Sequence, residues 1–175
     1  MKRWMMIGLL MSLSSASVYA QESDKLHLSG SLQSDMLLAQ KDSATGAEAT
    51  GSRFRTNTYL DLRLSNRYFE AGARLEYMPH PLPGYEHDFK GWGVPYAYLK
   101  GRYKNAELTL GSFYEQFGSG FILRSYEERS LGIDNSLQGV RLNYLPCAGV
   151  AVKLLTGRQR RYWHHNKSWM TGADV

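Results

Sequence analysis

From residue 26 onward, apolar side chains recur at every second position and polar side chains fill the positions between them. Leu60, Leu62 and Leu64 alternate in this way with Asp61 and Arg63. A period of two places successive side chains on opposite faces of a β-strand, whereas a helix would need apolar residues at i, i+3 and i+4. The pattern predicts seven strands and the start of an eighth, at 26–38, 55–64, 69–77, 94–103, 106–114, 137–144, 150–157 and from 169.

The segments between these strands alternate in length. Three are short, at 65–67, 104–105 and 145–149, and the others are long or of medium length, at 40–53, 79–93, 115–136 and 158–168. Outer-membrane barrels show this asymmetry, with tight periplasmic turns and longer extracellular loops. We therefore predict an all-β fold, an antiparallel up-and-down transmembrane β-barrel, with its short turns in the periplasm.

The cost of placing charge in lipid predicts which face points inward. A Lys or Arg that faces lipid at the midplane costs roughly 2 to 4 kcal/mol. We therefore expect the polar face to line the lumen and the apolar face to contact outer-membrane lipid. The basic side chains expected inside are Arg63, Arg74, Lys100, Arg102, Arg141 and Lys153, and the acidic ones are Asp35, Asp61, Glu70, Glu76 and Glu107.

Alternation alone also fits a soluble, exported β-sandwich whose charged face lies in water. Such a protein would bind carbohydrate through exposed aromatic side chains. The candidates for that role are Tyr85, Trp92, Tyr162 and Trp163.

The N-terminus has the three parts of a secretory signal peptide. Lys2 and Arg3 precede an apolar run at 4–13, and small residues lead to Ala20. The apolar run is about ten residues long, and a spanning helix needs about twenty. We expect cleavage after Ala20, which divides the chain into a signal peptide at 1–20 and a β-barrel segment at 21–175, and we expect the cell outer membrane as its location.

Net charge and cysteine content limit the binding partners and disulfides that the chain is expected to have. Removing the signal peptide leaves 19 basic and 16 acidic residues, a net charge of +3, without a Lys/Arg stripe of the kind that binds nucleic acid. A single cysteine, Cys147, allows no intramolecular disulfide. We expect no nucleic-acid partner and no cofactor, and we expect outer-membrane lipid, other envelope proteins or a small solute as partners.

Seven strands and the start of an eighth do not give the even number on which barrels of this class close. The sequence stops at 173–175 without a terminal aromatic strand. These features predict an incomplete, N-terminal portion of a larger barrel.

The stretch from Leu110 to Pro146 reads LGSFYEQFGSGFILRSYEERSLGIDNSLQGVRLNYLP. It resembles a family of Gram-negative outer-membrane barrel proteins that has no assigned activity, and the resemblance extends loosely over the rest of the chain. The resemblance implies location and fold, not chemistry. The plan of this stretch is also similar to substrate-specific and alginate-export porins, in which a loop after a strand folds into the pore.

The segment 115–136 is the corresponding excursion in this chain. Glycines at 118 and 120 permit reversals of the backbone, and we expect the apolar triplet at 121–123 to pack inside the barrel, with contact at the rim as the alternative. We expect Arg124 and Arg129 to lie near the carboxylates of Glu107, Glu76 or Asp61. The residues predicted to line the lumen or its constriction are Arg124, Glu127, Glu128 and Arg129, with Arg63, Arg74 and Arg102 of the wall.

The other clusters of acidic, histidine or basic residues do not indicate a catalytic or metal site. Glu127 and Glu128 are adjacent, so in an extended chain they point in opposite directions and cannot flank one bond as a glycosidase pair. The histidines at 80, 87, 164 and 165 lack the spacing of a zinc site. One basic and aromatic patch is expected at the outer rim, where it would contact lipopolysaccharide or an anionic solute, or simply be solvated: Arg158, Arg160, Arg161, Tyr162 and Trp163.

We therefore expect a non-catalytic outer-membrane protein that acts as a pore or as a scaffold in an envelope assembly. The soluble carbohydrate-binding β-sandwich is the second hypothesis.

Overall fold

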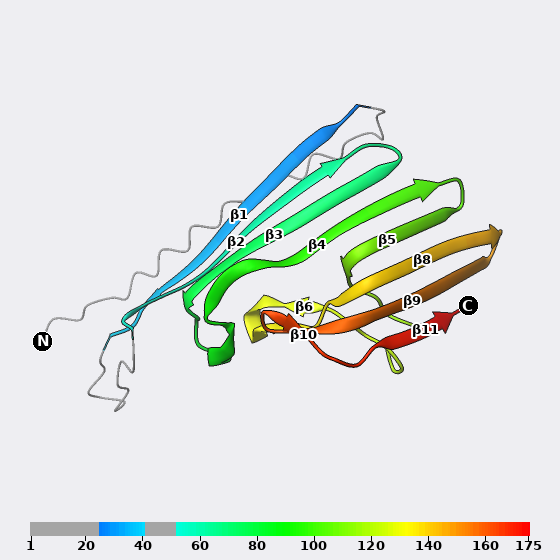
Figure 1. Cartoon of the computed structure of the whole chain (residues 1–175). Coiled ribbons are helices and arrows are strands. Elements are labelled where there is room, and N and C mark those ends of the chain that lie inside the picture. Colours follow the sequence, from blue (N-terminus) through cyan, green and yellow to red (C-terminus); the bar gives the residue numbers. More distant parts are fainter. Residues whose placement is uncertain (1–24, 41–51) are drawn as a thin grey trace, which may run out of the picture.

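The fold was analysed in a computed structural model that describes residues 25–40 and 52–175 (Figure 1). The predicted signal peptide and most of the first long connection lie outside the described residues. The main sheet contains eight strands of five or more residues: β1 (His27–Leu38), β2 (Phe54–Ser65), β3 (Phe69–His80), β4 (Gly91–Tyr103), β5 (Ala106–Phe113), β8 (Leu137–Cys147), β9 (Val150–Arg161) and β11 (Met170–Asp174).

These strands form an antiparallel meander in the order β1-β2-β3-β4-β5-β8-β9, with β11 paired to β9. The all-β, antiparallel prediction is confirmed. Each predicted strand is present, with ends that differ by a few residues, and the largest extension carries β9 from the predicted Gly157 to Arg161. The described strands make an open sheet with β1 at one edge and β11 at the other. Closure into a barrel therefore stays a prediction.

Smaller elements lie in the long connections. They are the 3-10 turns η1 (His87–Phe89) and η2 (Arg129–Leu131), the two-stranded sheet of β6 (Glu127–Glu128) and β7 (Ile133–Asp134), and β10 (His164–His165), which extends the edge of β9. Within 25–40 and 52–175, no helix has the length and apolar character needed to cross a membrane.

The short turns lie at one end of the sheet, and the connections 81–90 and 114–136 lie at the other (Figure 1). The turn at 66–68 is held by Asn66, whose side-chain oxygen accepts hydrogen bonds from the amides of Tyr68 and Phe69 at 2.8 and 2.9 Å. The turn at 148–149 is shorter than the predicted 145–149, because β8 continues to Cys147. Gly149 supplies the positive φ of 83° that this tight turn requires.

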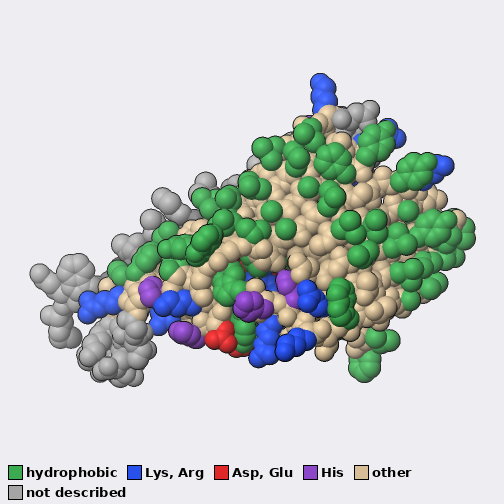
Figure 2. All heavy atoms as spheres, viewed as in Figure 1, with side chains coloured by type: hydrophobic (Ala, Val, Ile, Leu, Met, Phe, Trp, Pro, Cys, Tyr) green, Lys and Arg blue, Asp and Glu red, His purple; other side chains and the backbone are tan. Residues whose placement is uncertain are grey.

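The apolar face of the sheet is the more exposed face and the polar face is the more buried one, which is the reverse of the distribution in water-soluble proteins. On the apolar face, Leu28 is 75% exposed and Leu62 is 49% exposed. On the polar face, the side chain of Arg74 is 11% exposed and that of Glu76 is 2% exposed. Figure 2 shows hydrophobic side chains spread across the visible face of the sheet, with basic side chains gathered toward its two ends.

The buried core lies on the polar side, beneath the long connections. One cluster joins Phe113, Leu137 and Leu155 of the sheet to Phe117 of the 114–136 segment. A second cluster joins Tyr59 and Met78 of the sheet to Phe89 of η1. The long connections therefore pack onto the face that carries the charges, and they cover part of it.

Candidate functional site

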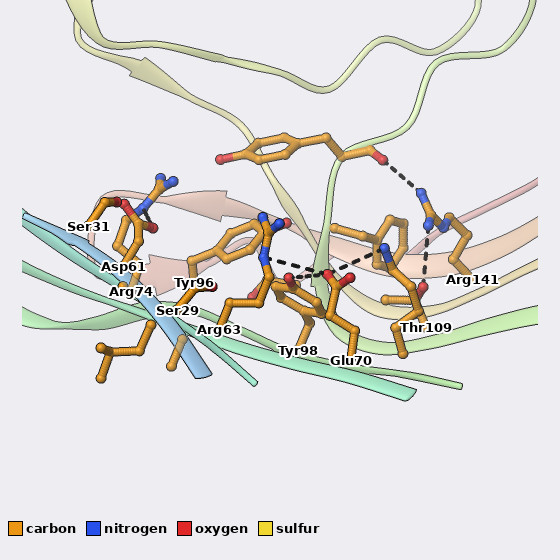
Figure 3. Close-up of a pocket in the computed structure, with 17 residues that line it drawn as sticks. Ser29, Ser31, Asp61, Arg63, Glu70, Arg74, Tyr96, Tyr98, Thr109 and Arg141 are labelled. Atoms are coloured by element: carbon orange, nitrogen blue, oxygen red, sulfur yellow. Dashed lines mark hydrogen bonds and ion pairs between the residues drawn. The ribbon is translucent and has the colours of Figure 1, made fainter. Parts of the chain in front are cut away.

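A cavity of about 680 Å³ opens on the polar face of the sheet. Its walls come from β1 to β5 and β8, and Tyr114 borders it at the start of the 114–136 segment. Figure 3 shows Arg63, Glu70, Arg74, Tyr98 and Arg141 extending from the strands toward this space. The volume falls in the range of about 300 to 1,000 Å³ that is usual for small-molecule sites.

Two acids and two arginines form a closed ring at one side of the cavity. Arg74 Nε lies 2.6 Å from Asp61, and Arg74 Nη1 lies 2.7 Å from Glu127. Arg129 Nε lies 2.8 Å from Glu127, and Arg129 Nη2 lies 3.6 Å from Asp61. Asp61 and Arg74 belong to β2 and β3, while Glu127 and Arg129 belong to the 114–136 segment. The ring therefore fastens that segment to the wall.

The ring is supported from two sides. Arg129 Nη1 donates a hydrogen bond to Gln33 of β1 at 2.6 Å, and its guanidinium lies 4.2 Å from the ring centre of Tyr59. Tyr85 donates its hydroxyl proton to the backbone carbonyl of Arg129 at 2.8 Å. Arg129 thus contacts β1, β2 and the 81–90 connection as well as its own segment.

A second network runs across the sheet as a ladder of charges. We use the name charge ladder for Arg63, Glu70, Lys100, Arg102, Glu107, Arg141, Glu115 and Lys153. Glu70 accepts from Arg102 at 3.2 Å, and Glu107 joins Arg102 at 3.2 Å to Arg141 at 3.0 Å. Glu115 joins Arg141 at 3.3 Å to Lys153 at 2.9 Å.

The exposed end of the ladder contains two weakly held cations. Lys100 Nζ lies 3.7 Å and Arg63 Nε lies 3.9 Å from the same carboxylate oxygen of Glu70. Both distances exceed the usual range of a hydrogen bond. Glu70 also accepts from the hydroxyl of Tyr98 at 2.5 Å and from Arg102, so its oxygens are already occupied.

Tyrosine rings form the floor between the two networks. Tyr96 stacks on Tyr114, with ring centres 5.3 Å apart, and meets Tyr98 edge-on at 5.8 Å. The Tyr98 ring lies over Gly72 on the neighbouring strand, where a Cβ atom would come within 2.4 Å of it. Gly72 therefore provides the space that lets the Tyr98 hydroxyl reach Glu70.

The predicted lumen residues divide into those that meet at the cavity and those that do not. Arg63, Arg74, Arg102, Glu127 and Arg129 take part in the ring or the charge ladder. Glu128 faces the other way and accepts from the amide and hydroxyl of Ser130, and these hydrogen bonds lower the pKa of Glu128. Glu127 and Glu128 therefore have different partners, as their adjacency implies.

The structure differs from the expectations for Arg124 and for the apolar triplet of the 114–136 segment. Arg124 reaches none of the three predicted carboxylates and instead packs over the ring of Tyr126, 4.9 Å from its centre. Phe121 is 96% exposed and Ile122 is 88% exposed, so these two residues do not pack against the described sheet, whereas Leu123 packs against the Phe117 cluster. The reason is an antiparallel bridge between Gln116 and Arg124, which turns the tip away from the sheet and leaves Leu123 alone against the core.

The expected basic patch at the outer rim is also wrong in its composition. Arg160 is buried, because β9 continues past Gly157 and carries it to Glu76 at 2.7 Å and Asp134 at 2.5 Å. Arg161 is exposed, and Arg158 packs over the ring of Trp169 at 5.3 Å. The ring of Trp163 lies against Gly91 and Gly93. The hydroxyl of Tyr162 donates a hydrogen bond to the carboxylate of Glu86, and this bond raises the pKa of Tyr162. The ring of Tyr162 packs edge-on against Phe89.

Two acids of the polar-face networks were not anticipated from the sequence. Glu115 is buried between Arg141 and Lys153, and Asp134 is buried beside Arg160. Both lie in a connection, outside the strand alternation, so the alternating pattern carries no information about their direction. The available signal for Glu115 was its position directly after the aromatic pair Phe113 and Tyr114 at the end of a strand.

Comparison with known protein families identifies one family, and its function is unknown. A family described as a family of unknown function (DUF6029) matches residues 1–175. No curated protein matches the chain. No solved structure matches it either. Among the described residues, no group of three or more His, Cys, Asp or Glu side chains is placed to hold a metal ion.

Proposed function

The chain belongs to that family, and we propose that it is an outer-membrane β-barrel protein that acts as a pore, with the 114–136 segment folded over the polar face as its constriction. A structural role in an envelope assembly is compatible with the same placement in lipid. The proposal assigns no catalytic step, since Glu127 is committed to two arginines and Glu128 to Ser130.

The observation that carries the proposal is the inverted distribution of side chains. The apolar face exposes leucine, valine or methionine from every long strand of the meander, including Leu28, Leu62, Leu75, Leu99, Leu110, Val140 and Leu154. Water-soluble monomers rarely expose contiguous apolar patches larger than a few hundred Å². Lipid removes that cost, and it requires the charged residues to lie on the opposite face, where the ring and the charge ladder pair them.

The pairing of the charges supports a lumen in particular. An unpaired charge in a site of low dielectric is costly, whereas alternating acids and bases neutralise one another. The ring alternates in this way between its two acids and two bases, and the charge ladder does so from Arg102 of β4 to Lys153 of β9. A barrel would also have to pair the outer edges of β1 and β11, with each other or with other strands, because lipid cannot satisfy exposed backbone groups.

The soluble sandwich hypothesis receives no such support. A sandwich needs a second sheet over the apolar face, and the second sheet found in the described part of the chain is the two-stranded β6-β7. Of the aromatics proposed to bind carbohydrate, Tyr85 and Tyr162 pack against the Tyr59 cluster, and Trp92 is exposed on β4. Trp163 lies with its ring against Gly91 and Gly93.

Fractionation of cells that produce the full chain tests the proposal. We expect the protein in the outer-membrane fraction, extracted only by detergent, and with faster gel migration before boiling than after it. Recovery in the soluble periplasmic fraction, with migration that does not depend on heating, would overturn the proposal in favour of the soluble alternative.

A further inference from the structure

The networks of the polar face differ in net charge. The ring of Asp61, Arg74, Glu127 and Arg129 contains two acids and two bases. The cluster of Arg160 with Glu76 and Asp134 has one base and two acids. The charge ladder contains five bases and three acids, so it carries a surplus of two positive charges.

The surplus lies at the cavity. Along the charge ladder from Lys153, Glu115 and then Glu107 each lie between two cations. At the other end of the ladder, the carboxylate of Glu70 is shared by three cations, Arg102, Lys100 and Arg63. The side chain of Arg63 is 61% exposed, and neither Arg63 nor Lys100 lies within hydrogen-bonding distance of Glu70. These two cations line the cavity with donors that a ligand can use.

The rest of the cavity suits a small organic molecule better than a bare ion. Tyr96 and Tyr98 present ring surfaces, and Ser29 and Ser31 of β1 add hydroxyl groups on the strand beside Arg63, whose register partner is Ser29. The hydroxyl of Tyr114 and Nε of Arg141 are buried beside the cavity and have no hydrogen-bond partner among residues 25–40 and 52–175. Buried polar groups usually have partners, so these two atoms add unused hydrogen-bonding capacity to the wall, while the accessible donors are those of Arg63 and Lys100.

We propose that this cavity is a binding site for a small organic anion, a solute whose carboxylate or phosphate group is held by Arg63 and Lys100. The proposal rests on the proposed function in one respect: the solute reaches the site through the lumen. Charge-assisted hydrogen bonds between guanidinium or ammonium and such oxygens are stronger than neutral ones. The hydroxyls and tyrosine rings contact the remainder of the solute.

Three sugars of one size and different charge test this inference. Binding of glucuronate, glucose and glucosamine to the full chain folded in detergent micelles is measured by equilibrium dialysis. We expect glucuronate to bind and the neutral and cationic sugars to bind at least about tenfold more weakly, since each lost charge-assisted contact is worth about tenfold or more. Equal binding of all three sugars, or binding of none, would overturn the inference.

A pair of charge-matched variants separates the site from the overall charge. Arg63→Gln with Lys100→Gln should abolish the preference for glucuronate. Arg67→Gln with Lys104→Gln removes the same charge in the short turns and should preserve it. The side chain of Arg63 is 61% exposed and its ion pair with Glu70 is long, at 3.9 Å, so Arg63→Gln alone keeps the test valid if the double variant does not fold. An unchanged preference in Arg63→Gln, or an equal loss in both double variants, would contradict the assigned site.

Conductance distinguishes this inference from the proposed pore. Binding in micelles without channels in planar bilayers would remove the pore and leave the anion site. Channels that conduct while glucuronate neither binds nor lowers their conductance would leave the pore and remove the anion site.

Discussion

Arg160 and Glu76 form a buried, two-bonded ion pair between residues 84 positions apart in the sequence. The guanidinium donates to the two carboxylate oxygens at 3.0 and 2.7 Å, and both side chains are at most 2% exposed. The pair ties the end of β9 to β3 beneath the long connections. It is surrounded by Asp134 and the ring of Phe89.

Removing the arginine from this pair should destabilise the fold. Arg160→Met leaves Glu76 and Asp134 buried without their cation, and breaking a buried pair in this way costs about 3 to 5 kcal/mol. We expect the free energy of unfolding, measured by urea titration in micelles, to fall by that amount. Arg161→Met, at the exposed neighbouring position, is the control and should change it by less than about 0.5 kcal/mol. Equal effects would show that the pair contributes nothing specific.

Leu62 and Arg63 test which face meets lipid. Leu62→Arg places a charge on the apolar face, and we expect it to lower stability by about 2 to 4 kcal/mol or to prevent membrane assembly. Arg63→Leu removes a long ion pair from an exposed side chain and should be tolerated. The measurement is the heat-modifiable fraction in the outer membrane. If the two variants assemble equally well, the assignment of the faces is wrong.

Deletion of 120–129 tests the constriction. It removes Glu127 and Arg129, which tie the 114–136 segment to the wall, and leaves Arg74 paired with Asp61. We expect the single-channel conductance in planar bilayers to rise, because the segment no longer lies over the polar face.

Point variants of the same segment serve as controls for the deletion. Arg129→Gln, which loses its contacts with Asp61 and Gln33, should raise conductance partway. Arg124→Gln alters a residue that contacts Tyr126 and should leave conductance unchanged. Unchanged conductance in the deletion would mean that the segment is no constriction.

Gly72 and Gly101 test how the Tyr98 ring is held. Gly72→Leu requires the Tyr98 ring to move, which breaks its hydrogen bond to Glu70. Overpacking of this kind costs about 1 to 3 kcal/mol. Gly101→Leu is the control, since nothing lies within 4 Å of the Cβ position there. We expect lower stability and a changed near-ultraviolet tyrosine signal for Gly72→Leu only. A tolerated Gly72→Leu would show that the ring does not depend on that space.

Local features of the sequence determined the sheet. A period of two assigns every strand residue to one of two faces without reference to distant residues, so the strands, their faces and the antiparallel meander follow from alternation and short turns. This is why Arg63, Arg74 and Arg102 were correctly expected to share the face opposite Leu62. Strand ends were less well determined, because a strand continues where its neighbour offers hydrogen bonds, as β9 does beyond Gly157.

Only the tertiary structure decided which charges meet. Arg124 and Arg129 are alike in the sequence, yet the bridge at Gln116 turns Arg124 outward while η2 begins at Arg129 and brings it to Asp61. Arg160 looked like a surface residue until the register of β9 placed it beside Glu76. Ion pairs between residues tens of positions apart depend on how connections fold over the sheet. Sequence periodicity determines the direction of a side chain within a strand, but it contains nothing about the path of a connection.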